Sequence, residues 1–101
     1  MMAILVIFTG NTTKSQYEAL RAEVNWERQH PKGGILHAAS FDDSDRIHVA
    51  DVWESADTMN AFVEQRLLPA FKKLGISPPE VAVYPVHNLN AYQAIDDFKM
   101  R

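Results

Sequence analysis

The sequence contains no cysteine, which excludes disulfide bonds, thiolate nucleophiles and Cys-ligated zinc or iron–sulfur clusters. It also lacks any run of Lys or Arg, and its 13 acidic and 10 basic residues give a formal charge of −3, which argues against a nucleic-acid partner. The opening stretch MMAILVIF is too short for a membrane span and has no basic flank typical of a signal peptide. We therefore expect a cytoplasmic protein that does not bind membranes.

The 101 residues suit one domain, and 47% of them are apolar, enough to build a core. Aromatic residues make up 10% of this short chain. Small α+β domains with such a surplus often bury part of it against another subunit, so we expect an oligomer.

The first half of the chain predicts a strand, a helix and a hairpin. Residues 2–9 are continuously apolar, as in a central strand. Thr13 and Gln16 form a capping-box pattern, and Tyr17, Leu20 and Val24 then recur at helical spacing. The polar cluster at 42–45 separates the strand-like runs ILHAASF and RIHVADVWE, which predicts a β-hairpin.

The second half predicts a long helix, an edge strand and a tail. Ser55 is a plausible helix N-cap, Pro69 predicts a kink or restart near residues 67–68, and Gly75 suits a C-terminal cap. Pro85 lies within EVAVYPVH and cannot donate to a sheet, so this strand should lie at an edge. We predict an α+β, ferredoxin-like βαββαβ domain over residues 1–88 with an antiparallel four-stranded sheet. Residues 89–101 form a tail, with a short helix that packs on a partner subunit.

The hairpin register decides which side chains share a face of the sheet. A turn centred between residues 43 and 44 pairs His37 with Ala50 and Leu36 with Asp51. One face then holds Leu36, Ala38, Ser40, Ile47, Val49, Asp51 and Trp53; the other holds Ile35, His37, Ala39, Phe41, His48, Ala50 and Val52. Because Asp51 between Val49 and Trp53 is costly unless it is hydrogen-bonded or beside a wet cavity, its face is the candidate site.

The stretch HVADVWESADTMNAF places Trp53-Glu54-Ser55 at a strand-to-helix junction, with Phe62 on the helix that follows. With the βαββαβ order, this pattern resembles dimeric α+β-barrel proteins of the antibiotic-biosynthesis-monooxygenase type over about residues 2–88. The stretches RLLPAF and PPEVAVYPVHN are most similar to uncharacterised bacterial members. The resemblance implies a homodimer whose subunits pack sheet against sheet, with helices outside and a ligand cavity in each half. It places the Trp53 face on the cavity and the His37 face under the helices.

The resemblance also bears on activity, since such proteins include haem degraders and cofactor-independent oxygenases of anthrones or quinols. Haem degraders use a histidine on the second helix and an asparagine on the first strand. Residues 55–74 contain no His and residues 1–9 no Asn, which argues against haem, so we expect no cofactor. Anthrone oxygenases have Asn and Trp on the third strand; here only Trp53 matches, because Val49 and Asp51 stand where Asn is expected.

Two sets of candidate residues follow. The catalytic candidates are Asp51, Trp53 and His37, and the ligand-binding candidates are Trp53, Val49, Leu36, His48 and His87. Asp51 is either a general base or a hydrogen-bond partner of a neighbour such as Ser40, and Trp53 either lines a cavity or packs the junction. The predicted register makes His37 and His48 diagonal neighbours, but no third ligand is identifiable, so no metal site is expected.

We therefore expect a small-molecule-binding dimer, with cofactor-independent monooxygenase activity on an aromatic or quinol-like substrate as the leading hypothesis. Two alternatives stay open. One is a non-catalytic ligand-binding or stress-associated dimer, and the other is an isomerase or lyase that uses the same cavity.

Overall fold

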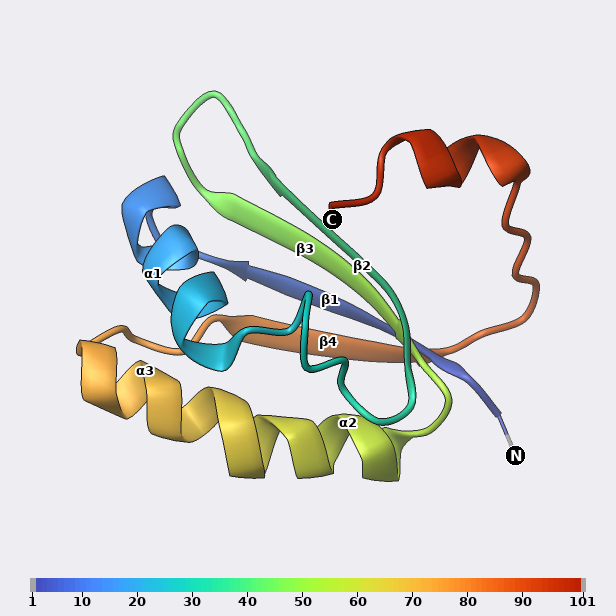
Figure 1. Cartoon of the computed structure of the whole chain (residues 1–101), viewed down its shortest axis with the longest axis horizontal. Coiled ribbons are helices and arrows are strands. Elements are labelled where there is room, and N and C mark those ends of the chain that lie inside the picture. The colour runs from blue at the N-terminus through green and yellow to red at the C-terminus, as the bar shows by residue number, and fades with distance from the viewer. Residues whose placement is uncertain (1, 101) are drawn as a thin grey trace.

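A computed structural model describes residues 2–100. Residue 1 of the predicted domain and residue 101 of the predicted tail lie outside the described residues. The chain forms a four-stranded antiparallel sheet in the order β2-β3-β1-β4 (Figure 1). The strands are β1 (Ile4–Gly10), β2 (Gly34–Phe41), β3 (Ile47–Trp53) and β4 (Glu80–Pro85). This order confirms the ferredoxin-like α+β fold, with β1 central and the Pro85-containing strand at an edge.

The helices begin and end where the local sequence predicts. Helix α1 (Lys14–Val24) starts with the Thr13–Gln16 capping box, in which each side chain bonds the other's backbone amide. The second helical segment starts at α2 (Ala56–Phe62), where the Ser55 side chain accepts from the Thr58 amide. It ends at Gly75, whose φ of 69° lies in the left-handed region that glycine adopts without strain.

Pro69 changes the helical winding rather than breaking the helix. A π-helical turn, η1 (Val63–Leu67), joins α2 to α3 (Leu68–Leu74), and the Leu68 amide donates to the Val63 carbonyl five residues back. Because proline has no amide proton, the ordinary bond to the fourth preceding carbonyl is missing at Pro69. The predicted interruption near residues 67–68 is therefore a wider turn in a continuous rod (Figure 1).

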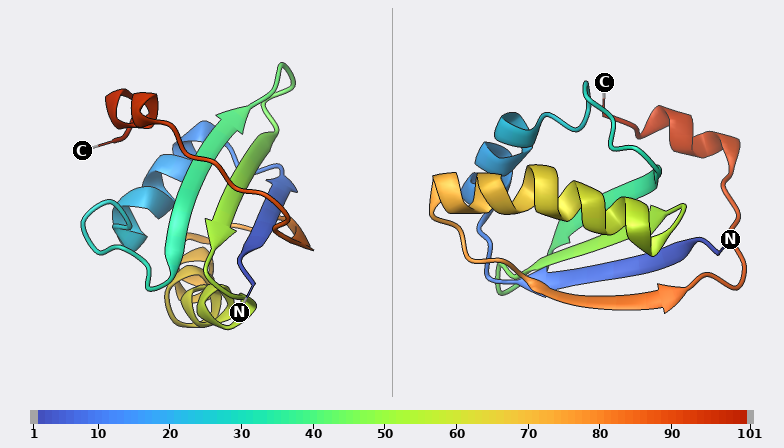
Figure 2. Two further views of the ribbon diagram at one scale, coloured as in Figure 1. Left: turned by 90° about the vertical axis from the view of Figure 1, so that its right-hand side faces the viewer. Right: turned by 90° about the horizontal axis from the view of Figure 1, so that it is seen from below.

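All of the longer helices cover one face of the sheet (Figure 2). The core lies between them and the strands, and Val6 at its centre is fully buried. Its other buried members are Ile4, Phe8, Leu20, Val24, Ile47, Val49, Trp53, Met59, Phe62, Ala70, Phe71 and Ile76. We call this side of the sheet the helix face and the opposite side the outer face.

The hairpin register differs from the prediction by one residue. Phe41 pairs with Ile47 and His37 with Asp51, so five residues rather than four close the turn. The Asp42 carboxylate accepts from the Ser44 and Arg46 amides, and Asp45 takes a left-handed φ of 62°, which together stabilise the longer turn. A register irregularity between Gly34 and Leu36 adds one residue at the other end of β2.

This shift corrects the predicted faces. His37 and Asp51 lie on the same face, and Trp53 beside them belongs to the helix-face core. The predictions that Asp51 and Trp53 share a face with Leu36, and that Trp53 lines a cavity on the side away from the helices, are both wrong. Side chains alternate along a strand, so one added turn residue moved residues 36–41 of β2 to the other side relative to β3.

After β4 the chain passes the strand ends and forms a short 3₁₀-helix, η2 (Gln93–Asp97), drawn in red in Figure 1. Within residues 2–100, no helix has both the length and the apolar character to cross a membrane.

Candidate functional site

A chain of four hydrogen-bonded side chains lies on the helix face. The Tyr17 hydroxyl is 2.7 Å from His37 Nε2, and His37 Nδ1 is 2.7 Å from Asp51 Oδ1. The Trp53 indole donates to Asp51 Oδ2 over 3.3 Å. Helix α1, edge strand β2 and central strand β3 thus contribute to one arrangement, which we call the Tyr17–Trp53 chain.

The protons of this chain can be assigned from its chemistry. Trp53 can only donate, so Asp51 accepts from it, and an ionised Asp51 also accepts from His37 Nδ1–H. His37 Nε2 then carries no proton, and its lone pair accepts a hydrogen bond from the Tyr17 hydroxyl. Burial, together with the nearby Glu27 carboxylate, raises the pKa of Tyr17 to about 12, which keeps that hydroxyl protonated at neutral pH. These hydrogen bonds therefore favour one tautomer of a neutral His37, with the proton on Nδ1.

Exposure falls steeply along the chain. The His37 side chain is 35% exposed and the Asp51 side chain 11%, while Trp53 is buried against Phe62 with ring centroids 5.3 Å apart. The imidazole is therefore the member that a dissolved molecule can reach, and the buried carboxylate behind it orients the ring. This is the arrangement by which a carboxylate holds a histidine base in enzymes.

Aromatic rings surround the exposed imidazole. Trp26, in the connection after α1, lies 5.2 Å from the His37 ring centroid at a tilt of 59°. Tyr17 lies 5.7 Å from Trp26 and 6.2 Å from Phe41. Tyr17 and Trp26 therefore border the exposed imidazole with apolar ring surface.

The structure divides the predicted site residues into three groups. Asp51, Trp53 and His37, the catalytic candidates, meet in the Tyr17–Trp53 chain, and Val49 is buried in the same core. Leu36 pairs with Val52, and His48 pairs with Ser40. Successive side chains of a strand point to opposite faces, so these pairs, each next to a helix-face residue, lie on the outer face. His87 lines a separate apolar hollow of about 380 Å³ at the outer face, with Leu5 and Val52. The five ligand-binding candidates therefore do not form one site.

Two finer points change with the register. Asp51 does bond a cross-strand neighbour, but that neighbour is His37 rather than Ser40, which lies opposite His48. His37 and His48 are not diagonal neighbours but lie on opposite faces. Among residues 2–100, no cluster of three or more His, Asp or Glu side chains has a metal-binding arrangement.

Sequence reasoning missed Tyr17 and Trp26. Helical spacing predicts Tyr17 as part of the apolar stripe of α1, and no role is predicted for Trp26. One signal was available for Tyr17: a hydroxyl on a stripe that faces the sheet needs a buried partner. Trp26 carried no such signal, because its position depends on how the connection folds back.

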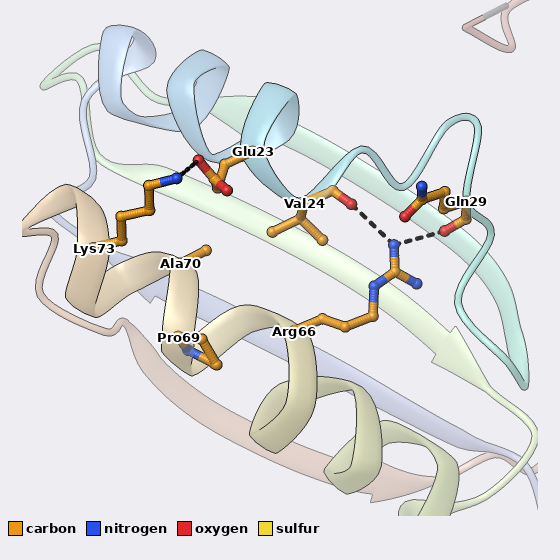
Figure 3. Close-up of a pocket in the computed structure, with 7 residues that line it drawn as sticks. All are labelled: Glu23, Val24, Gln29, Arg66, Pro69, Ala70 and Lys73. Carbon is orange, nitrogen blue, oxygen red and sulfur yellow. Dashed lines mark hydrogen bonds and ion pairs between the residues drawn. The ribbon is translucent and has the colours of Figure 1, made fainter.

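A second groove, of about 250 Å³, lies between α1 and α3 and contains Arg66 and Lys73 (Figure 3). Arg66 Nη2 donates to the Val24 and Gln29 carbonyls over 2.9 and 2.7 Å, and its guanidinium lies 5.0 Å from the Phe62 ring. Lys73 pairs with Glu23 at 3.0 Å. Both cations thus hold α1 against the second helical segment, and the Arg66 nitrogen needed for a paired bond to a carboxylate is already occupied. This groove is a structural contact.

The fold and the site together define a class: a ferredoxin-like α+β domain with a histidine–carboxylate pair on its helix face. No protein-family model matches the sequence, and a search of curated protein sequences gives no significant match. Solved structures do match, and they confirm at the level of the fold the resemblance to antibiotic-biosynthesis-monooxygenase-like proteins.

Three solved structures illustrate the match. A candidate antibiotic biosynthesis monooxygenase from Chloroflexus aurantiacus superposes with a TM-score of 0.65 at 18% identity, covering 88% of this chain and 97% of its own. SnoaB, a cofactor-independent oxygenase from Streptomyces nogalater, gives 0.60 at 16%, covering 87% and 94%. A conserved protein from Methanosarcina mazei gives 0.62 at 14%, covering 83% and 92%.

Proposed function

We propose that this protein is a cofactor-independent monooxygenase that acts on a small aromatic or quinol-like molecule bound beside His37. The observation that carries the proposal is the Tyr17–Trp53 chain. In it, a partly exposed His37 imidazole lies beside aromatic rings and is oriented by the buried Asp51 carboxylate. The oxygenase activity of a structural neighbour, SnoaB, supports the same reaction class.

In the proposed reaction, His37 is the base. Tyr17 must turn away from Nε2, after which Nε2 takes a proton from an acidic C–H₂ group of the substrate. Asp51 stabilises the imidazolium that forms, and Trp53 keeps Asp51 in place; both act as positioning residues. A neutral imidazole with a free Nε2 lone pair is the form such a proton transfer requires.

The deprotonated substrate then supplies all of the electrons. It passes one electron to dioxygen, and the two radicals combine to form a C–O bond. The peroxide anion takes the proton back from the His37 imidazolium, and the resulting hydroperoxide loses water to leave a carbonyl. One oxygen atom enters the product and the other leaves as water, so a C–H₂ group and O₂ become C=O and H₂O.

We also propose a homodimer that covers the outer face. Leu5, Ile7 and Leu36 remain only half-buried there, and Tyr84 is exposed. An apolar sheet face of this kind is typical of a protein–protein contact.

A binding protein without turnover is the second candidate. The observation that favours it is that both ring nitrogens of His37 already have protein partners. In that case the Tyr17–Trp53 chain would only hold α1 against β2 and β3.

Oxygen uptake with a panel of anthrones and quinols separates the two candidates. His37→Gln should lower turnover by roughly 100-fold or more, the usual contribution of a general base, while ligand binding changes little. His48→Gln is the matched control, because His48 pairs with Asp42 on the opposite face at the same 2.7 Å. Turnover that survives His37→Gln would refute the assigned base, and tight binding without oxygen uptake would establish the second candidate.

A further inference from the structure

The C-terminal tail, residues 89–100, carries large apolar side chains into solvent. Tyr92 is 74% exposed, Phe98 83% and Met100 65%, and Leu89 is also exposed. Figures 1 and 2 show the tail leaving the end of β4 and running past the ends of the strands. Among the described residues, Phe98, Tyr92 and Met100 are the three most exposed large apolar side chains.

The tail is not a structure that is stable without a covering surface. Its single regular element is η2, a 3₁₀-helix of five residues, and the residues on either side of it, Tyr92 and Phe98, are the most exposed. A helix this short gains too little from its own hydrogen bonds to persist in water unless it packs on something.

The outer face offers a matching surface. The hollow of about 380 Å³ is lined by Leu5, Val52 and Pro85 on the strands and by residues 86–89 at the root of the tail. The root thus starts at the hollow, while the rings of Tyr92 and Phe98 lie farther along the chain and leave it open. A tail of about ten residues can span roughly 33 Å when extended, which compares with domain extents of 35 × 28 × 25 Å.

We infer that the tail of each copy lies on the outer face of a second copy, with its aromatic rings over the hollow at Leu5 and Val52. This inference rests on the homodimer proposed above and names the segment that completes it. The reciprocal exchange accounts for two observations at once: an outer face on which Leu5 is only half-buried, and a tail whose apolar side chains are exposed. It also satisfies two-fold symmetry, since each copy gives a tail and receives one.

The area is sufficient for a stable contact. An aromatic side chain carries roughly 150–250 Å² of surface, so the two exposed rings on each of two tails present on the order of 600 Å². Covering them hides a similar area of the two outer faces, which gives about 1,200 Å² in total. That value is at the lower end of stable protein–protein interfaces, before any direct contact between the sheets is added.

The first experiment measures dimer dissociation by sedimentation equilibrium on the full chain. Tyr92→Glu combined with Phe98→Glu should raise the dimer dissociation constant at least about tenfold, because charged side chains cannot enter the apolar hollow. Leu68→Glu is the matched control, since Leu68 is 43% exposed on the helix side, and it should leave dissociation unchanged. A dissociation constant unaffected by the double tail variant would overturn the inference while leaving the sheet-to-sheet dimer standing.

The second experiment locates the tail. A photoreactive phenylalanine analogue in place of Phe98, in a mixture of isotopically heavy and light chains, should give cross-links between heavy and light copies near Leu5 or Val52. Cross-links confined to single chains would show that the tail folds on its own sheet and would refute exchange. A wild type that stays monomeric would refute both the dimer and the exchange, whereas oxygen uptake tests the His37 site independently.

Discussion

The hairpin carries two histidine–aspartate pairs, one on each face, and they differ in their surroundings rather than in their geometry. His37–Asp51 on the helix face and His48–Asp42 at the outer side each have a nitrogen–oxygen distance of 2.7 Å. The Asp51 side chain is 11% exposed and bonds the buried Trp53, whereas the Asp42 side chain is 36% exposed and also bonds the turn residues.

The difference shows how burial decides what the same two residue types can do. Asp51 has little access to water, so its two oxygens must be satisfied by protein donors, and this fixes the orientation of His37. Asp42 can exchange its partners for water at small cost, and its main role is to close the turn. The helix-face pair is therefore the candidate for chemistry and the outer pair a local structural contact.

The largest effect should follow from removing the buried carboxylate. Asp51→Ala leaves Trp53 Nε1–H and His37 Nδ1–H without an acceptor, which should lower the free energy of unfolding by roughly 2–4 kcal/mol. Denaturant titration measures this change. Asp42→Ala is the matched control and should cost clearly less; equal losses for the two variants would remove the distinction between the pairs.

The next effect concerns Tyr17. Tyr17→Phe removes its bond to His37 and should lower stability by about 1 kcal/mol at neutral pH. Because folding raises the pKa of Tyr17 from 10.0 to about 12, the contribution of the hydroxyl is complete below pH 10 and is lost as pH rises through 12. Urea unfolding of both proteins across this range should show the difference shrinking. A difference that stays constant would mean that Tyr17 titrates alike in the folded and unfolded states.

The smallest effect should come from acidifying the outer pair. Hydrogen bonds from His48, Ser44 and Arg46 hold the pKa of Asp42 well below its ordinary value. A group with a lowered folded pKa contributes stability above its unfolded value of 3.8 and loses it as pH falls below that value. The stability gap between wild type and Asp42→Asn should therefore narrow below about pH 4. Thermal unfolding at several acidic pH values measures the gap, and a gap independent of pH would contradict the assignment.

Much of the fold follows from short stretches of sequence. The Thr13–Gln16 capping box, the Ser55 N-cap and Gly75 place the helix ends, because each acts within one turn of backbone. Pro85 marks an edge strand for an equally local reason, its missing amide proton. The element order, and with it the ferredoxin-like topology, could be predicted from such signals.

The site could be predicted only in part. The sequence identifies His37, Asp51 and Trp53 as candidates and places Asp51 and Trp53 on one face, but whether His37 joins them depended on one residue in the turn. The five-residue turn is stabilised by the Asp42 hydrogen bonds and by the left-handed backbone of Asp45. Because side chains alternate along a strand, a turn of four residues instead of five would put the β2 side chains on the opposite face. Tyr17 and Trp26 join His37 only once α1 and the following connection pack on β2. Local chemistry thus specifies the elements, whereas the assembly of the Tyr17–Trp53 chain depends on long-range packing, because its members come from three elements that meet only in the folded domain.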